Sequence, residues 1–260
     1  NIAGWCNIML EGKQGDRIVL RHGEILNEDG SLYTENLGAA IQTDTVILGS
    51  SGKLDYEPRF TYHGFRYVEI SGLRNEPDKS ILNAKVIASD QPRTGHFSCS
   101  NPMLNQLYQN INRSHISNMH GVPTDCPQRD ERCGWMGDVY IFAQTSMFNR
   151  DMAAFYTKWM RDVLDAQSDR GTFPDIAPHP FAPGKHFTNA PGWADAGIRL
   201  PYLMYLNYGD KEIIEDHFNA YERYIQNIHE NNPELIWRSG LGLNYGDWLN
   251  GNTLKAEGFP

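Results

Sequence analysis

The chain has 260 residues, of which 40% are hydrophobic and 21% are charged, and its formal net charge is -9. This length suffices for one large domain or two ordinary ones, and the composition is typical of a globular protein. No run of about 18 apolar residues exists to span a bilayer, and an acidic chain lacks the clustered Lys and Arg that bind a phosphate backbone. The composition therefore excludes a membrane protein and a nucleic-acid-binding protein.

The four cysteines show no CxxC pair and no zinc-ligand spacing, so neither a metal site nor a disulfide framework is expected. The chain begins at Asn1 rather than Met and shows no signal peptide, which indicates that it is part of a longer protein. Its localisation stays open between the cytoplasm, the periplasm and secretion.

Short β-strands separated by turns rich in Gly and Asp are predicted for the first 88 residues. In the fourth of them, Phe60, Tyr62, Phe65 and Tyr67 alternate with polar neighbours, which is the period of a half-buried sheet. Strands of this kind favour a β-sandwich. The expected strands are residues 5–10, 17–26, 45–48, 59–71 and 84–88.

The hydrophobic period changes from two to about 3.6 near residues 90–95, where the segment Asp-Gln-Pro-Arg-Thr-Gly interrupts the pattern. This change predicts a β-sandwich domain over residues 1–92 and a helical domain over residues 93–260.

A first helix is expected from Pro102 to about Met119, with Asn101 as its N-cap. Its apolar stripe consists of Leu104, Leu107, Tyr108 and Ile111. Further helices are expected at residues 139–148, 152–167, 195–207 and after Asp210. Helices joined by long loops rich in Trp, Asp and Gly favour an all-α barrel whose loops form the functional site.

The most informative stretch is GVPTDCPQRDERCGWMGD, residues 121–138, which lies between two predicted helices. A solvated charged loop is one interpretation. Within the stretch, Pro123, Pro127, Gly134 and Gly137 favour a rigid loop instead, because they fix the backbone geometry. The charged residues of the stretch are Asp125, Arg129, Asp130, Glu131, Arg132 and Asp138.

A rigid acidic loop suits glycoside hydrolysis. That reaction needs one carboxylic acid to protonate the leaving oxygen and a second carboxylate to activate water or attack the anomeric carbon. Trp135 in the same loop offers a flat face for a sugar ring.

The motif from Asp125 to Asp138 resembles the signature of glycoside hydrolase family 78, the bacterial-type α-L-rhamnosidases. Upstream, LRHGEIL, GSLYTENL and YEPRFTYHGFRY are similar to the β-sandwich that precedes the catalytic barrel in that family. The resemblance covers essentially the whole chain. It implies a mixed β and α fold, in which a β-sandwich is followed by the N-terminal part of an (α/α)6 barrel of the six-hairpin type.

The resemblance also implies an inverting hydrolase that needs no metal or cofactor and acts on L-rhamnose-containing glycosides or polysaccharides. Glu131 would be the general acid, and Arg129 would help to hold the loop. Asp125 and Asp138 would bind rhamnose hydroxyls, while Trp135 would wall the subsite.

Two later segments match barrel-loop motifs of the same family. Trp193 lies in Pro-Gly-Trp-Ala-Asp, where Ala194 replaces the family's usual Gly, and Asp247 and Trp248 lie in Tyr-Gly-Asp-Trp-Leu. These three residues complete the predicted substrate-binding set.

The general base of that family is a Glu from a later loop between helices. Only about five of the twelve helices of such a barrel are predicted here, and Glu257 is the one residue after Trp248 to consider. The base is therefore expected beyond Pro260, with this polypeptide catalytically incomplete. Exposed barrel helices would then favour homo-oligomers or marginal stability.

Two alternatives stay open. Another (α/α)6 enzyme, such as an unsaturated glucuronyl hydrolase, would need basic residues for a uronate, for which only Lys185 and Arg199 are candidates. A non-catalytic carbohydrate-binding or structural fragment would agree with the β-sandwich and with the missing base.

Overall fold

The computed structural model describes residues 1–181, 186–238, 242, 244–246 and 248. The chain forms two compact units. The first unit comprises Asn1–Asp90, Phe97–His120 and Thr124–Arg132, and the second comprises Gln91–His96, Gly121–Pro123 and Cys133–Pro260. The division of the chain into domains at residue 92 stays a prediction.

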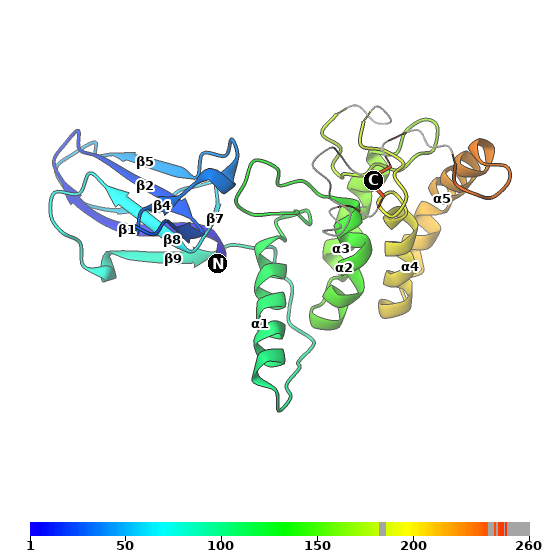
Figure 1. Cartoon of the computed structure of the whole chain (residues 1–260), viewed down its shortest axis with the longest axis horizontal. Coiled ribbons are helices and arrows are strands. Elements are labelled where there is room, and N and C mark those ends of the chain that lie inside the picture. Colours follow the sequence, from blue (N-terminus) through cyan, green and yellow to red (C-terminus); the bar gives the residue numbers. More distant parts are fainter. Residues whose placement is uncertain (182–185, 239–241, 243, 247, 249–260) are drawn as a thin grey trace. The chain divides into compact units, whose positions relative to one another are not determined.

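Two antiparallel sheets dominate the first unit (Figure 1). In one sheet, β1 (Ile2–Gly12) pairs with β6 (Gly52–Tyr56), β7 (His63–Phe65) and β9 (Leu82–Val86). In the other, β2 (Arg17–Gly23) lies between β5 (Thr43–Ile47) and β8 (Tyr67–Ser71). A small ribbon joins β3 (Ile25–Leu26) to β4 (Leu32–Tyr33).

Apolar side chains from both sheets form one core. Cys6, Ile8 and Leu10 alternate along β1, and Ile18 and Leu20 alternate along β2, so each strand turns one face inward. The predicted β-sandwich is confirmed.

The predicted strand over residues 59–71 is wrong as a single element. It is two strands, β7 and β8, that belong to different sheets, and the chain crosses between them at Arg66, whose backbone N–H donates to Gly23 O at 2.9 Å. Phe60, expected on the buried face, has a positive φ of 58° and is fully exposed. Aromatic alternation thus predicted a strand where part of the segment is a loop.

Helix α1 (Pro102–Ser117) begins as predicted, because the Asn101 side chain accepts a hydrogen bond from Met103 N and Pro102 is the first helical residue. It packs against β1. The predicted apolar stripe is only partly correct, since Tyr108 is buried but Leu104 and Leu107 are about half exposed.

Where the structure describes it, the second unit contains four helices: α2 (Met136–Asn149), α3 (Ala153–Asp165), α4 (Ala196–Tyr208) and α5 (Glu212–Asn231). Helix α4 contacts the other three (Figure 1). Among the described residues of the second unit, the largest wholly buried side chains are those of Trp159, Tyr156 and Tyr224. Among the described residues, no helix combines the length and the apolar character needed to cross a bilayer.

Candidate active site

The signature segment, Asp125 to Asp138, is shared between the units, because Thr124–Arg132 belongs to the first and the residues from Cys133 onward belong to the second. Helix α2 begins three residues earlier than predicted, at Met136. Asp138 therefore lies exposed in the first turn of this helix, where a negative charge is favourable.

In the first unit the structure brings together three predicted site residues. Arg129 Nη2 donates to Glu131 Oε2 at 2.6 Å and to Asp125 Oδ2 at 3.4 Å. The Asp125 side chain is 8% exposed and that of Glu131 is 35% exposed, so Glu131 is the more accessible of the two to a ligand. Although partial burial opposes it, the neighbouring Cys126, Glu131 and Asp125 raise the pKa of Arg129.

The residues on either side of Glu131 anchor it to the sandwich. Asp130 Oδ2 accepts a hydrogen bond from Ala39 N at 2.8 Å, and Arg132 donates to Tyr62 O at 3.1 Å and to Gln42 Oε1 at 3.0 Å. The Arg132 guanidinium also lies 4.6 Å from the centre of the Tyr62 ring. Glu131 is therefore held between two fixed neighbours, for which the sequence analysis predicted no role.

A pocket of the first unit opens beside this anchored segment. Gln42, Tyr62 and His63 line it from the sandwich, and residues 129–132 line it from the signature segment. Glu131 thus borders a space that a ligand can enter.

In the second unit, aromatic rings that are far apart in sequence gather around Tyr245. Its ring centre lies 4.6 Å from Trp193, 5.5 Å from Trp248 and 6.0 Å from Trp135. We call these four residues the aromatic cluster. All three tryptophans were predicted site residues, whereas Tyr245 was not recognised. Aromatic faces of this kind suit the apolar face of a sugar ring.

Two signature glycines permit close contacts in this unit. A Cβ at Gly137 would lie 2.5 Å from Trp193 Nε1, and a Cβ at Gly134 would lie 2.0 Å from Ala177 O. Only glycine allows the start of α2 to approach Trp193 this closely.

A wholly buried carboxylate, Asp175, supports the aromatic cluster. Its Oδ2 accepts a hydrogen bond from the Tyr245 hydroxyl at 3.0 Å, its Oδ1 accepts from Ala190 N at 2.9 Å, and its backbone oxygen accepts from Met136 N at 2.8 Å. Burial raises the pKa of Asp175 to about 6. Asp175 was not among the predicted site residues, although its position in Phe-Pro-Asp-Ile-Ala-Pro is a signal for a restrained loop.

Asp175→Asn is expected to remove a pH dependence of stability. Because the folded pKa lies above the ordinary carboxyl value, the contribution of Asp175 to stability is fully present below about pH 4 and is lost as the pH rises through about 6. This loss corresponds to at most about 3 kcal/mol of unfolding free energy. Urea unfolding at about pH 4 and pH 7 measures it.

The asparagine variant should lose less stability than the wild type over this interval. Asp169→Asn, at an exposed position of the same unit, is the matched control and should behave as the wild type does. Parallel pH profiles for the wild type and Asp175→Asn would contradict the assignment.

Three residues named in the sequence analysis, Lys185, Asp247 and Glu257, lie outside the described residues. Trp248 is described and is 45% exposed.

A β-sandwich joined to helices whose loops carry carboxylates and tryptophans agrees with the class that the signature implies, the glycosidases with a helical-hairpin catalytic domain. Residues 92–258 match the bacterial alpha-L-rhamnosidase 6 hairpin glycosidase domain, and residues 1–88 match the bacterial alpha-L-rhamnosidase concanavalin-like domain. The chain belongs to the bacterial α-L-rhamnosidase family. The family and the fold class predicted from the signature are confirmed.

Curated relatives agree with these matches. An alpha-L-rhamnosidase of Streptomyces avermitilis is 40% identical over 96% of this chain and 24% of its own length. One of Formosa agariphila is 36% identical over 97% of this chain and 27% of its own length. The chain thus spans about a quarter of the length of the curated relatives it matches.

Solved structures are similar as well. The Streptomyces avermitilis enzyme complexed with L-rhamnose has a TM-score of 0.90 at 39% identity, over 96% of this chain and 24% of that one. The native Aspergillus terreus enzyme has a TM-score of 0.88 at 35% identity, over 96% of this chain and 29% of that one.

Proposed function

We propose that the complete polypeptide carrying this chain is an inverting glycoside hydrolase that releases terminal L-rhamnose from α-L-rhamnosides. The observation that carries the proposal is the signature segment, in which Asp125, Arg129 and Glu131 form a connected cluster beside an open pocket. The similarity to an enzyme solved with L-rhamnose supports the choice of sugar. The family match favours this function over an unsaturated glucuronyl hydrolase and over a non-catalytic fragment.

In the proposed reaction the Glu131 carboxyl donates its proton to the glycosidic oxygen while the bond from that oxygen to the anomeric carbon breaks. Positive charge develops on the sugar ring and is stabilised by nearby carboxylates. Water attacks the opposite face and loses its proton to a second carboxylate, which completes inversion. Of the two catalytic carboxylates, we assign only the acid.

The other predicted site residues are assigned to binding. Asp125 and Asp138 would accept hydrogen bonds from rhamnose hydroxyls, and Arg129 would hold Asp125 and Glu131 in place. The tryptophans of the aromatic cluster would line the sugar-binding subsite. Asp247 completes the proposed set, outside the described residues.

The complete polypeptide is expected to hydrolyse p-nitrophenyl α-L-rhamnoside and to release the β-anomer of L-rhamnose first, because inversion reverses the anomeric configuration. Absorbance follows the nitrophenol, and proton NMR at early times identifies the anomer. The p-nitrophenyl β-glucuronide serves as the control substrate and should not react. Absence of turnover would refute the proposed activity, and initial release of the α-anomer would refute inversion.

A further inference from the structure

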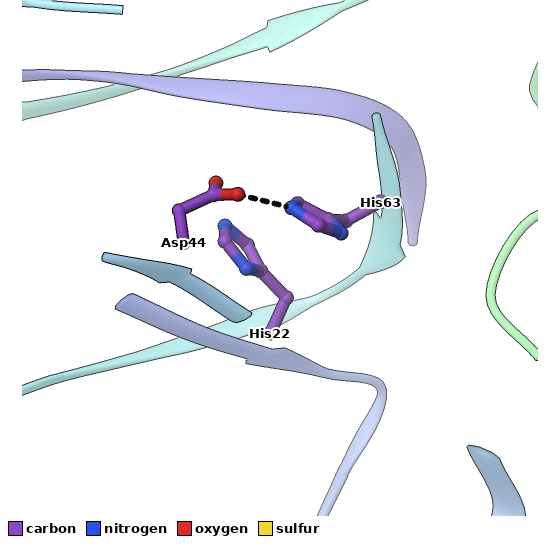
Figure 2. A group of neighbouring side chains, drawn as sticks. All are labelled: His22, Asp44 and His63. Atoms are coloured by element: carbon purple, nitrogen blue, oxygen red, sulfur yellow. Dashed lines mark hydrogen bonds and ion pairs between the residues drawn. The ribbon is translucent and has the colours of Figure 1, made fainter. Parts of the chain in front are cut away.

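Inside the sandwich, three potential metal ligands that belong to no predicted site face one another (Figure 2). His22 follows Ile18 and Leu20 in the inward alternation of β2, and Asp44 lies opposite Leu20 in the register of β5. His63 is on β7, where it lies opposite Gly4 of β1, so it comes from the other sheet. Their nitrogen and carboxylate ligand atoms all lie within 4.8 Å of one another.

A single residue, Gln42, orients both imidazole rings. Its side-chain Nε2 donates to Gly64 O at 2.8 Å, which turns its Oε1 toward His63 Nδ1 at 3.1 Å. Its backbone oxygen lies 3.2 Å from His22 Nδ1. Because both contacts offer an oxygen acceptor, each ring carries a hydrogen on Nδ1 and directs Nε2 toward Asp44. Histidines that bind metals are commonly held in this way, with the second ring nitrogen donating to a carbonyl oxygen.

His22 Nε2 has no partner in the described structure, although the residue is wholly buried. Figure 2 shows its ring directed toward the Asp44 carboxylate, with no hydrogen bond between them. A buried acceptor without a donor is rare and needs an explanation, such as a bound ion or an ordered water.

His63 Nε2 lies 3.0 Å from Asp44 Oδ1, a hydrogen-bond distance that is slightly shorter than the roughly 3.3 Å between two ligands of one tetrahedral ion. The pocket lined by Gln42 and His63 gives an ion a route to the cluster from the surface.

We propose that His22 Nε2, His63 Nε2 and the Asp44 carboxylate bind one divalent transition-metal ion of the zinc class. Imidazole nitrogens select such ions over Ca²⁺ and Mg²⁺, which prefer oxygen ligands. Binding would turn the rings out of their stacked arrangement, in which the centres are 4.1 Å apart, because a metal lies in the plane of each ring that binds it. The ion would connect the two sheets.

The test uses the complete polypeptide without a histidine tag, stripped of metal by a chelator and titrated with Zn²⁺ in a calorimeter. We expect about one ion per chain in this site. Asp44→Asn should weaken binding at least about tenfold, since even residues behind the ligands typically account for that much. Asp55→Asn, on the exposed edge strand β6, is the matched control and should bind as the wild type does.

A second variant distinguishes loss of metal binding from misfolding. His22→Phe removes the unpartnered nitrogen and keeps an aromatic ring in the core, so it should fold, bind no ion at the site and lose the thermal stabilisation that Zn²⁺ gives the wild type. Circular dichroism checks folding, and the visible absorption of bound Co²⁺ reports nitrogen ligation. Failure of the stripped wild type to take up Zn²⁺, or equal affinity in the wild type and in both variants, would overturn the proposal.

Discussion

Glu131→Gln is expected to reduce the turnover of rhamnosides by the complete polypeptide by about a hundredfold or more, the usual contribution of a general acid. Glutamine keeps the size of the side chain and can still form hydrogen bonds, but it has no acidic proton for the leaving oxygen. The contact with Arg129 can persist, because the amide oxygen still accepts a hydrogen bond. Loss of activity with unchanged thermal stability would therefore report chemistry rather than unfolding.

The leaving group gives the sharper test of this prediction. A p-nitrophenolate departs with little help from an acid, whereas the alcohol of a natural glycoside must be protonated as it leaves. The loss should accordingly be smaller for p-nitrophenyl rhamnoside than for an unactivated rhamnoside. Glu11→Gln, on an exposed end of β1, is the control and should leave both rates unchanged. An equal loss on both substrates would show that Glu131 is not the acid.

Gly64→Ala is expected to impair both stability and activity. A Cβ at this position in β7 would lie 2.8 Å from Gln128 Cβ and 2.9 Å from Gln128 N and Pro127 C, closer than packed atoms tolerate. The signature segment would have to move away from the sandwich, which costs about 1–3 kcal/mol as in other overpacked sites. Urea unfolding should show the lower stability, and kcat/KM for a rhamnoside should fall several-fold because Glu131 shifts with the segment.

Gly49→Ala is the matched control for this effect. Gly49 is exposed, and a Cβ there would meet no atom within 4 Å. The control should retain wild-type stability and activity. If Gly64→Ala behaves like the control, the sandwich does not position the signature segment through this contact.

Local patterns in the sequence correctly predicted the features whose causes are local. Asn101 and Pro102 begin α1 because a cap and a first-turn proline act on neighbouring backbone groups. The signature from Asp125 to Asp138 identified the family, and with it the (α/α)6 barrel, because its chemistry lies in one continuous segment.

Strands were less predictable where burial does not alternate. Strand β6 was missed because four of its five residues are exposed and its order comes from pairing with β1. The segment 59–71 was predicted as one strand because its aromatic spacing is regular, yet the crossover at Arg66 depends on a hydrogen bond to Gly23, more than forty residues away. Pairing between distant strands leaves little trace in a local pattern.

Tertiary structure alone decided which side chains meet. Tyr245 joins three tryptophans and the buried Asp175, from segments that no short motif connects. No metal site was expected from the sequence, because the cysteines show no CxxC pair and no zinc-ligand spacing. His22, Asp44 and His63 have no such spacing, and they meet because inward positions of strands from two facing sheets converge when the sandwich closes.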